Sequence, residues 1–290
     1  MASKIMTTPL SKNLKRFKGL FFGPPSVGKT TFALGFPKVH LFDCERGAEN
    51  DQYIDLLEKR GSTRLLTTDF DDLLTQTRAY ASEKHDRQTL VYDPITVPYN
   101  AMLDKYADEV GTDFGRHKIP ADRKMRHLLN LCFRSDLNII MIAHAKTNWV
   151  RSKDARGNDT ITDAGKTFDA FNKSDYSFDF VGEAAKRGPD RILIVRKSRL
   201  DAFPEGSELP LSYDAFADKY GRHLIEREVV PVEFATAEQV DELSRLLDVR
   251  TDGETLKERW LKKAEAEDLT ELPKDIADKC IVYLKEGKKE

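Results

Sequence analysis

Gly19-Leu-Phe-Phe-Gly-Pro-Pro-Ser-Val-Gly-Lys-Thr-Thr31 joins a short apolar run to the start of a helical pattern. The run Leu20-Phe-Phe22 predicts a buried strand, and Phe32 lies in the helix that follows. A phosphate-binding loop needs this order, because its backbone N–H groups and the positive end of the helix must converge on one anion. In the pattern Gly-x-x-x-x-Gly-Lys-Thr, the lysine reaches the outer phosphates and the threonine hydroxyl is positioned for Mg²⁺.

We therefore predict that the chain binds ATP together with Mg²⁺. The predicted nucleotide-binding residues are those of the loop and the first turn of the helix: Gly23, Pro24, Pro25, Ser26, Val27, Gly28, Lys29, Thr30 and Thr31. A glycine-rich turn that contains Lys-Thr by chance is the alternative, and the flanking strand and helix patterns argue against it.

The bulk composition describes an ordinary globular protein of 290 residues, 40% hydrophobic and 33% charged, with a net charge of -2. No apolar stretch approaches the roughly 20 residues of a membrane span, and the N-terminus lacks the apolar core of a signal peptide. These features predict a cytoplasmic protein that does not contact a membrane. The cysteines, Cys44, Cys132 and Cys280, are far apart and odd in number, so we expect reduced, partly buried thiols.

Three further apolar runs, 39–43, 89–93 and 138–144, are separated by helical patterns at about 48–60, 69–84 and 121–135. The runs are continuous rather than alternating, which is typical of a parallel sheet covered by helices on both faces. We therefore predict an α/β fold with a mostly parallel, twisted sheet. Ligands of such sheets bind at the carboxyl ends of the strands, where Gly23, Glu45, Asp93 and His144 all fall.

Hydrolysis of a triphosphate requires a metal on the β and γ oxygens and a group that aligns the attacking water. Asp93, which ends an apolar strand, is the predicted metal-side carboxylate together with Thr30. Asp43 and Glu45 are two residues apart, so on a strand they share a face and either can approach the water. The alternative for each acid is a helix cap or a surface carboxylate.

The second half of the chain divides into three kinds of segment. Residues 148–175 are polar without periodicity and predict a long loop, and strands are expected at 191–195, 209–213 and 222–226. After Pro231 the patterns are helical only, at about 236–247, 253–267 and 273–285, with Thr236 and Gln239 as a capping box. We predict a basic tail over 1–18, an ATPase core over 19–230 and a small all-α domain over 231–290.

The phosphate loop, the Asp43-Cys-Glu45 strand end, Asp93 and the strand end at Ala143-His-Ala-Lys146 together resemble the RecA-type recombinase core. The resemblance implies that Glu45 polarises the attacking water and that His144 senses the γ-phosphate and opens a DNA-binding loop. Lys197-Ser-Arg199 is similar to the Lys-x-Arg pair that such ATPases insert into a neighbouring subunit. The resemblance thus makes Lys197 and Arg199 candidate catalytic cations in trans.

In chain length and sequence motifs, the chain resembles phage-encoded, core-only RecA-like single-strand annealing proteins, often labelled AAA-family ATPases. The resemblance covers roughly residues 17–225. This likeness implies a DNA-dependent ATPase that anneals or exchanges single-stranded DNA during recombination or replication. It also implies a homo-oligomer, ring or filament, with shared ATP sites, and a single-strand-binding protein as a possible accessory.

Two basic segments occupy the places of the two DNA loops in that family. Residues 115–134 have six basic residues against Asp122, and residues 148–175 add an aromatic residue among cations, a mixture that can stack a base and follow phosphates. A solvated basic face is the alternative for both segments and for the tail. The predicted DNA-binding residues are Arg116, Lys118, Trp149, Arg151, Lys153, Arg156 and Lys166.

Other functions remain open from the sequence. A helicase-like or packaging motor of the same fold predicts directional unwinding and a ring. A low-turnover adaptor predicts that the helical tail, with 11 basic and 16 acidic residues, recruits a partner in replication or recombination. A small-molecule kinase fits the phosphate loop alone, but leaves Lys197, Arg199 and the basic segments unexplained.

Overall fold

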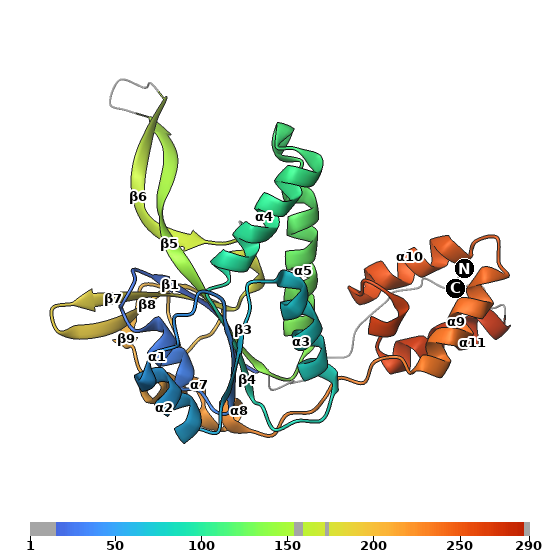
Figure 1. Cartoon of the computed structure of the whole chain (residues 1–290), viewed down its shortest axis with the longest axis horizontal. Helices are drawn as coiled ribbons and strands as arrows, with labels where there is room; N and C mark the ends of the chain where they lie inside the picture. Colours follow the sequence, from blue (N-terminus) through green and yellow to red (C-terminus); the bar gives the residue numbers. More distant parts are fainter. Residues whose placement is uncertain (1–15, 154–158, 172–173, 287–290) are drawn as a thin grey trace.

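The computed structural model describes residues 16–153, 159–171 and 174–286, and the strands between residues 18 and 210 form a single twisted sheet (Figure 1). Within these residues the strand order is β3-β2-β4-β5-β1-β7-β8-β9, and β6 pairs only with β5. The strands are β1 Lys18–Gly23, β2 Val39–Asp43, β3 Thr63–Leu66, β4 Thr89–Asp93, β5 Asn138–Lys153, β6 Asp159–Asp169, β7 Phe180–Arg187, β8 Asp190–Ser198 and β9 Glu208–Pro210.

The central part of the sheet is parallel, as predicted. β1 pairs in parallel with β5 and β7, and β4 pairs in parallel with β2 and β5. The register aligns Gly23 with His144 and Asp43 with Asp93, so these strand ends meet at one edge of the sheet. β8 runs antiparallel to β7 and returns from that edge toward the opposite one.

Helices cover both faces of the sheet because neighbouring strand residues alternate between two hydrophobic clusters. Leu20 and Phe22 pack with α3, α4 and α5, whereas Phe21 between them packs with α1, α2, α7 and α8. This alternation is what a sheet buried on both faces requires. The helices of the core are α1 Lys29–Leu34, α2 Asp51–Lys59, α3 Phe70–Ser82, α4 Thr96–Val110, α5 Lys118–Arg134, α6 Ser174–Ser177, α7 Tyr213–Tyr220 and α8 Arg222–Glu226, with a short 3₁₀ turn η1 at Asp113–Gly115.

Two projections rise from the core: the α4–α5 hairpin and the two-stranded ribbon of β5 and β6 (Figure 1). The ribbon corrects the prediction of a long loop over 148–175, because β5 continues to Lys153 and β6 returns antiparallel to it. Most of its side chains beyond the core are exposed or half-buried on both faces. A ribbon without a buried face has no apolar alternation, which is the signal that predicts strands.

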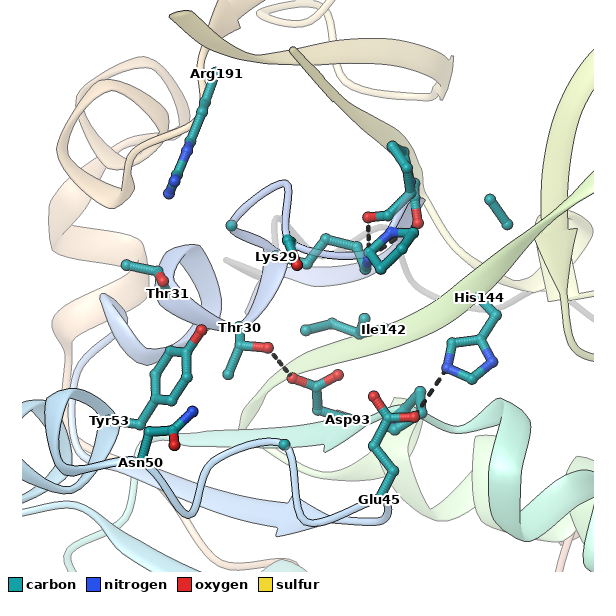
Figure 2. Close-up of a pocket in the computed structure, with 18 of the residues that line it drawn as sticks. Lys29, Thr30, Thr31, Glu45, Asn50, Tyr53, Asp93, Ile142, His144 and Arg191 are labelled. Atoms are coloured by element: carbon teal, nitrogen blue, oxygen red, sulfur yellow. Dashed lines mark hydrogen bonds and ion pairs between the residues drawn. The ribbon is translucent and has the colours of Figure 1, made fainter. Parts of the chain in front are cut away.

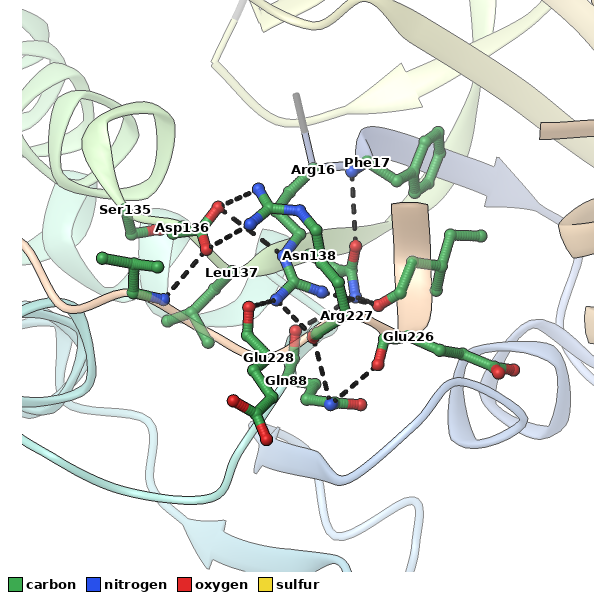
Figure 3. Close-up of polar contacts among 12 residues, drawn as sticks. Arg16, Phe17, Gln88, Ser135, Asp136, Leu137, Asn138, Glu226, Arg227 and Glu228 are labelled. Atoms are coloured by element: carbon green, nitrogen blue, oxygen red, sulfur yellow. Dashed lines mark hydrogen bonds and ion pairs between the residues drawn. The ribbon is translucent and has the colours of Figure 1, made fainter. Parts of the chain in front are cut away.

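The segment 222–226 is the helical turn α8 and not the predicted strand. It packs Ile225 into the core, where its carbonyl accepts a hydrogen bond from the buried guanidinium of Arg16 (Figure 3). The same guanidinium donates to the carbonyls of Arg227 and Glu228 and pairs with Asp136. If residues 222–226 formed the predicted strand, the Arg16 guanidinium would lose these contacts.

The prediction of a basic tail over residues 1–18 is partly wrong. Arg16 and Lys18 are internal structural cations, because Lys18 donates to the carbonyls of Cys132, Ser135 and Leu137 at 2.7, 2.9 and 2.7 Å. Burial lowers the pKa of Lys18 to about 7. The remaining basic residues of the tail lie outside the described residues.

The C-terminal helices form a hydrophobic cluster of their own around Leu243, Leu272 and Ile281. They are α9 Ala237–Asp248, α10 Gly253–Ala264 and α11 Lys274–Glu286, with the 3₁₀ turn η2 at Leu269–Glu271. The capping box of Thr236 and Gln239 is present as predicted. The exact domain boundary near residue 231 stays a prediction. All three cysteines are buried free thiols, and no helix in the described part of the chain is long and apolar enough to span a bilayer.

Candidate active site

The loop between β1 and α1 lines a cavity of about 800 Å³ at the carboxyl edge of the sheet (Figure 2). Of the predicted loop residues, Val27 turns into the core, and the others line the cavity. Gly23 has φ +149° and approaches the β7 backbone so closely that a Cβ would lie 2.3 Å from the Ala184 oxygen. The strand-to-loop turn therefore depends on this glycine.

The Lys29 side chain crosses the beginning of the loop. Its ammonium donates to the carbonyl oxygens of Gly23 and Pro24 at 2.9 and 2.8 Å. Burial lowers the pKa of Lys29, and the nearby carboxylates of Asp93 and Glu45 act in the opposite direction. The lysine is thus a cation fixed at the point where the outer phosphates of a nucleotide bind in this type of loop.

Thr30 and Asp93, the predicted metal ligands, lie next to each other in the cavity. The Thr30 hydroxyl donates to Asp93 Oδ2 at 2.6 Å (Figure 2). Adjacent oxygen ligands of octahedral Mg²⁺ lie about 2.9 Å apart, so this pair fits two neighbouring coordination positions. Burial raises the pKa of Asp93 to about 6, with the Thr30 hydrogen bond opposing that shift. A bound Mg²⁺ would favour the ionised carboxylate and would neutralise charge on the β and γ oxygens.

Glu45 and His144 meet at the opposite side of the cavity from α2. Glu45 lies in the loop after β2, His144 lies on β5, and their Oε2 and Nε2 atoms are 3.1 Å apart (Figure 2). Both side chains are about half exposed, 46% and 45%. The carboxylate is therefore accessible to water and near Lys29 and Asp93, which is the position required of a residue that aligns an attacking water.

Asp43 does not share this position, and the prediction that it could approach the water is wrong. Its carboxylate is buried and accepts from the backbone N–H groups of Gly47 and Ala48 and from Arg64. β2 ends at Asp43, so the strand alternation that would place it beside Glu45 does not extend that far. Asp43 instead fixes the loop that presents Glu45.

The cavity also contains residues that the sequence did not predict, chiefly Asn50, Tyr53 and Arg191. Asn50 and Tyr53 lie at the start of α2, and Arg191 lies near the start of β8 (Figure 2). Tyr53 lies in the first turn of α2, directly after the loop that contains Glu45. This position in the sequence could have identified it as a cavity residue. Arg191 follows the phosphate loop by more than 160 residues and belongs to no local motif, so only the sheet topology brings it there.

Residues 15–200, which include every residue of the cavity, match the AAA_24 family profile, described as an AAA domain. The chain belongs to the AAA_24 family. It is accordingly a P-loop NTPase with a RecA-like α/β fold, and the residues of its cavity suit a nucleotide with Mg²⁺.

No curated protein matches the chain. Among solved structures, the RadB recombinase is similar with 19% identity and a TM-score of 0.43, over 66% of this chain and 84% of that chain. An ATPase from the type III secretion system of pathogenic bacteria is similar with 13% identity and a TM-score of 0.43, over 94% of this chain and 81% of that chain.

Lys197 and Arg199 do not reach the cavity of their own chain in this AAA_24 protein. Lys197 pairs with Val181, level with Leu20 of β1, about 20 Å along β8 from Arg191 at the strand rise of 3.3 Å per residue. Its ammonium is held by the carbonyls of Asp175 and Phe178, and burial lowers its pKa. Arg199 pairs with Asp179. Their action on a neighbouring subunit stays a prediction.

The predicted DNA-binding residues lie on the two projections. Arg116 and Lys118 are exposed where α4 turns into α5, and Phe114 beside them is fully exposed. Trp149, at 64% exposure, and the exposed Arg151, Lys153 and Lys166 lie on the ribbon. Arg156 lies outside the described residues.

The bases of the two projections meet at Thr96, the first residue of α4. Its buried hydroxyl accepts from the His144 N–H at 2.9 Å and donates to the Asp169 carbonyl at 2.5 Å. His144 belongs to the cavity, and Asp169 ends the ribbon. The Thr96 hydroxyl therefore joins the backbone of a cavity residue to the base of the ribbon and to α4.

Three residues of the basic segment 115–134 contact other parts of the protein. His127 Nε2 lies 2.8 Å from Glu271 Oε1, and the Arg134 guanidinium donates to the Glu271 carbonyl at 2.8 Å. Lys124 pairs with Asp71 on α3. Lys124 thus contacts α3, whereas His127 and Arg134 contact the C-terminal helical region.

Proposed function

We propose that the protein is an oligomeric, DNA-dependent ATPase that binds single-stranded DNA and promotes its annealing or strand exchange in recombination or replication. The observation that carries the proposal is the contact of the bases of both projections at Thr96, which also binds the backbone of the cavity residue His144. This arrangement can couple the state of a nucleotide to the state of both projections.

The side chains on the projections suit single-stranded nucleic acid. Trp149 on the ribbon and Phe114 on the hairpin are aromatic rings without a packing role, since they are 64% and 106% exposed. Exposed cations accompany them, Arg151 beside Trp149 and Arg116 beside Phe114. Aromatic rings that stack bases and cations that follow the phosphates are the combination used by proteins that bind single strands.

The chemistry of the cavity supports hydrolysis by this chain. Lys29 would bind the outer phosphates, Thr30 and Asp93 would hold Mg²⁺, and Glu45 would orient the attacking water. His144 shares a hydrogen bond with Glu45, so a terminal phosphate that draws either residue changes the other. In the proposed cycle, ATP orders the projections on DNA and hydrolysis releases them.

The test is the ATPase rate of the full chain with and without single-stranded DNA over a range of protein concentrations. We expect stimulation by DNA that rises cooperatively with protein concentration, and loss of all turnover in Lys29→Ala. Directional unwinding of a duplex would favour a motor instead. An ATPase rate that is unchanged by single-stranded DNA at every protein concentration would refute the proposal.

A further inference from the structure

We propose that Arg191 is a nucleotide-binding residue supplied by the same chain, whose guanidinium contacts the α- and β-phosphates. The inference rests on nucleotide binding at the phosphate loop and not on the proposed role with DNA. It concerns the end of the cavity away from Glu45 and His144, where Figure 2 shows Arg191 extending toward the loop and Thr31.

The side chain lies directly on the phosphate loop. Arg191 Nη1 is 3.0 Å and Cδ 3.3 Å from the position that a Cβ on Gly28 would take. Gly28 is therefore favoured for its φ of +103°, and the Arg191 side chain occupies the space next to it. Backbone N–H groups of this loop cradle the α- and β-phosphates of a bound nucleotide, so a guanidinium over Gly28 is within reach of the same oxygens.

The backbone of Arg191 is held on both sides. It pairs with Lys186 of β7, and its carbonyl accepts from the Leu211 N–H at 2.9 Å. Because β8 is antiparallel to β7, the start of β8 lies at the carboxyl edge where the cavity is. The strand thus presents one arginine to the loop from a fixed position.

Arg191 differs from the other arginines of this hairpin. Arg187 pairs with Glu208, Arg196 with Glu183 and Arg199 with Asp179. In the described part of the chain, the Arg191 guanidinium has no hydrogen bond or ion pair. An exposed guanidinium without a protein carboxylate is available for a phosphate, which it can bind through two parallel hydrogen bonds.

The charge of the cavity supports the same assignment. Among the described residues that line it, Lys29 and Arg191 carry fixed positive charge, against the carboxylates of Glu45 and Asp93. Lys29 lies toward the outer phosphates, so Arg191 supplies the cation for the inner ones. Without it, the polyphosphate would meet a cavity of net negative charge.

The test compares ADP and ATP affinity, by titration calorimetry on the full chain, in Arg191→Ala, Arg191→Lys and the matched hairpin variant Arg187→Ala. We expect Arg191→Ala to weaken ADP and ATP alike by about tenfold or more, as for the loss of charged hydrogen bonds. Arg191→Lys should recover part of the loss, and Arg187→Ala should bind as the unchanged protein does. The melting temperature of Arg191→Ala should match that of the unchanged protein, because in the described part of the chain the Arg191 guanidinium has no hydrogen bond or ion pair to lose, whereas Arg187→Ala loses the surface ion pair with Glu208.

ADP affinity that is unchanged in Arg191→Ala would overturn the inference, provided that Lys29→Ala abolishes binding and so confirms the nucleotide site. Weaker binding of ADP with unchanged binding of diphosphates of other bases would also overturn it, because the arginine would then contact the base. A fall in turnover without a change in ADP affinity would place it at the terminal phosphate instead. Failure of the unchanged protein to bind any nucleotide would refute the nucleotide site itself.

Discussion

At the scale of single residues, the pair of Glu45 and His144 determines whether the cavity can hydrolyse what it binds. Glu45→Gln keeps the size of the side chain and a hydrogen-bond acceptor for His144 but removes the carboxylate. We expect kcat to fall roughly 100-fold or more, the usual contribution of a general base, with little change in ATP affinity. ATPase assays with ATP and equilibrium binding of ATP measure the two effects separately.

Glu49→Gln is the matched control. Glu49 follows in the same loop, pairs with Arg46 at 3.5 Å and is not among the residues that line the cavity. It should leave kcat unchanged. Hydrolysis at the normal rate in Glu45→Gln would remove Glu45 from the mechanism.

His40 predicts how stability responds to acid. It is 6% exposed on β2, its Nδ1 lies 2.8 Å from the Thr63 hydroxyl, and burial lowers its pKa to about 4. The unfolded chain takes up a proton near pH 6.5, but the folded chain does not until about pH 4. The free energy of unfolding should therefore fall as the pH drops through this window, by about 2 kcal/mol between pH 7 and pH 5.

Urea denaturation at pH 7 and pH 5 measures this loss, and His40→Gln supplies the comparison because its amide does not titrate. The variant should be less stable at pH 7, yet lose about 2 kcal/mol less between the two pH values than the unchanged chain. Equal losses in both proteins would show that other groups cause the acid sensitivity.

At the scale of elements, the β5–β6 ribbon is where the proposed DNA contact can be separated from folding. Side chains alternate between its faces, so Trp149 and Arg151 share one face and Val150 lies on the other. Trp149→Ala should weaken single-stranded DNA binding by about tenfold, since a stacked base contributes about 1–3 kcal/mol. Fluorescence anisotropy of a labelled single-stranded oligonucleotide measures this loss of affinity.

Val150→Ala removes a side chain of the opposite face at 38% exposure and serves as the control. It should bind DNA normally, and both variants should keep the basal ATPase rate. An equal loss of DNA affinity in the two variants would indicate damage to the ribbon rather than a lost stacking contact.

Thr96 tests the coupling between elements. Thr96→Val keeps the shape of the side chain but removes the hydroxyl that joins the His144 N–H to the Asp169 carbonyl. We expect a loss of about 1–3 kcal/mol of stability from the unpaired groups. We also expect stimulation of the ATPase by DNA to be lost while ATP affinity is retained. Thr96→Ser keeps the hydroxyl and should restore stimulation, and stimulation intact in Thr96→Val would disprove the coupling.

The elements that the sequence predicted have a buried face, although β7 and α4 also have one and were not predicted. Continuous apolar runs predicted β1, β2, β4 and the first half of β5, and the helical periodicities predicted α2, α3 and the C-terminal helices. β3 was missed because it is short and half-exposed, and the ribbon was missed because neither of its faces is buried. The loop motif and the strand ends located most of the cavity, whereas Arg191 depends on an antiparallel return that no local pattern predicts.

At the scale of the whole molecule, one set of contacts joins the C-terminal helical region to the core, and a second set holds the linker before it. Glu271 of η2 contacts His127 and Arg134 of α5, and Arg78 of α3 reaches Thr270. The chain between the core and these helices is held separately, because Asp136 pairs with Arg227 and accepts from the Val230 N–H at 3.0 Å (Figure 3). The second set of contacts does not require the helices.

This difference predicts where the chain can be shortened. A chain that ends at Val230 keeps Ile225 in the core and all three carbonyl acceptors of the buried Arg16 guanidinium. It should unfold in one cooperative transition and hydrolyse ATP. A chain that ends at Gly221 leaves that guanidinium buried without its acceptors, which should cost about 3 kcal/mol or more.

Circular dichroism melts and ATPase assays of the two shortened chains, beside the full chain, separate the roles of the linker and the helices. If the chain ending at Val230 hydrolyses ATP but no longer binds single-stranded DNA, the DNA site cannot lie in the projections alone, since those are intact. If it is as unstable as the chain ending at Gly221, the contacts of Glu271 stabilise the core more than the Arg16 contacts do. Only retention of both activities by the longer chain agrees with a catalytic and DNA-binding core that ends before α9.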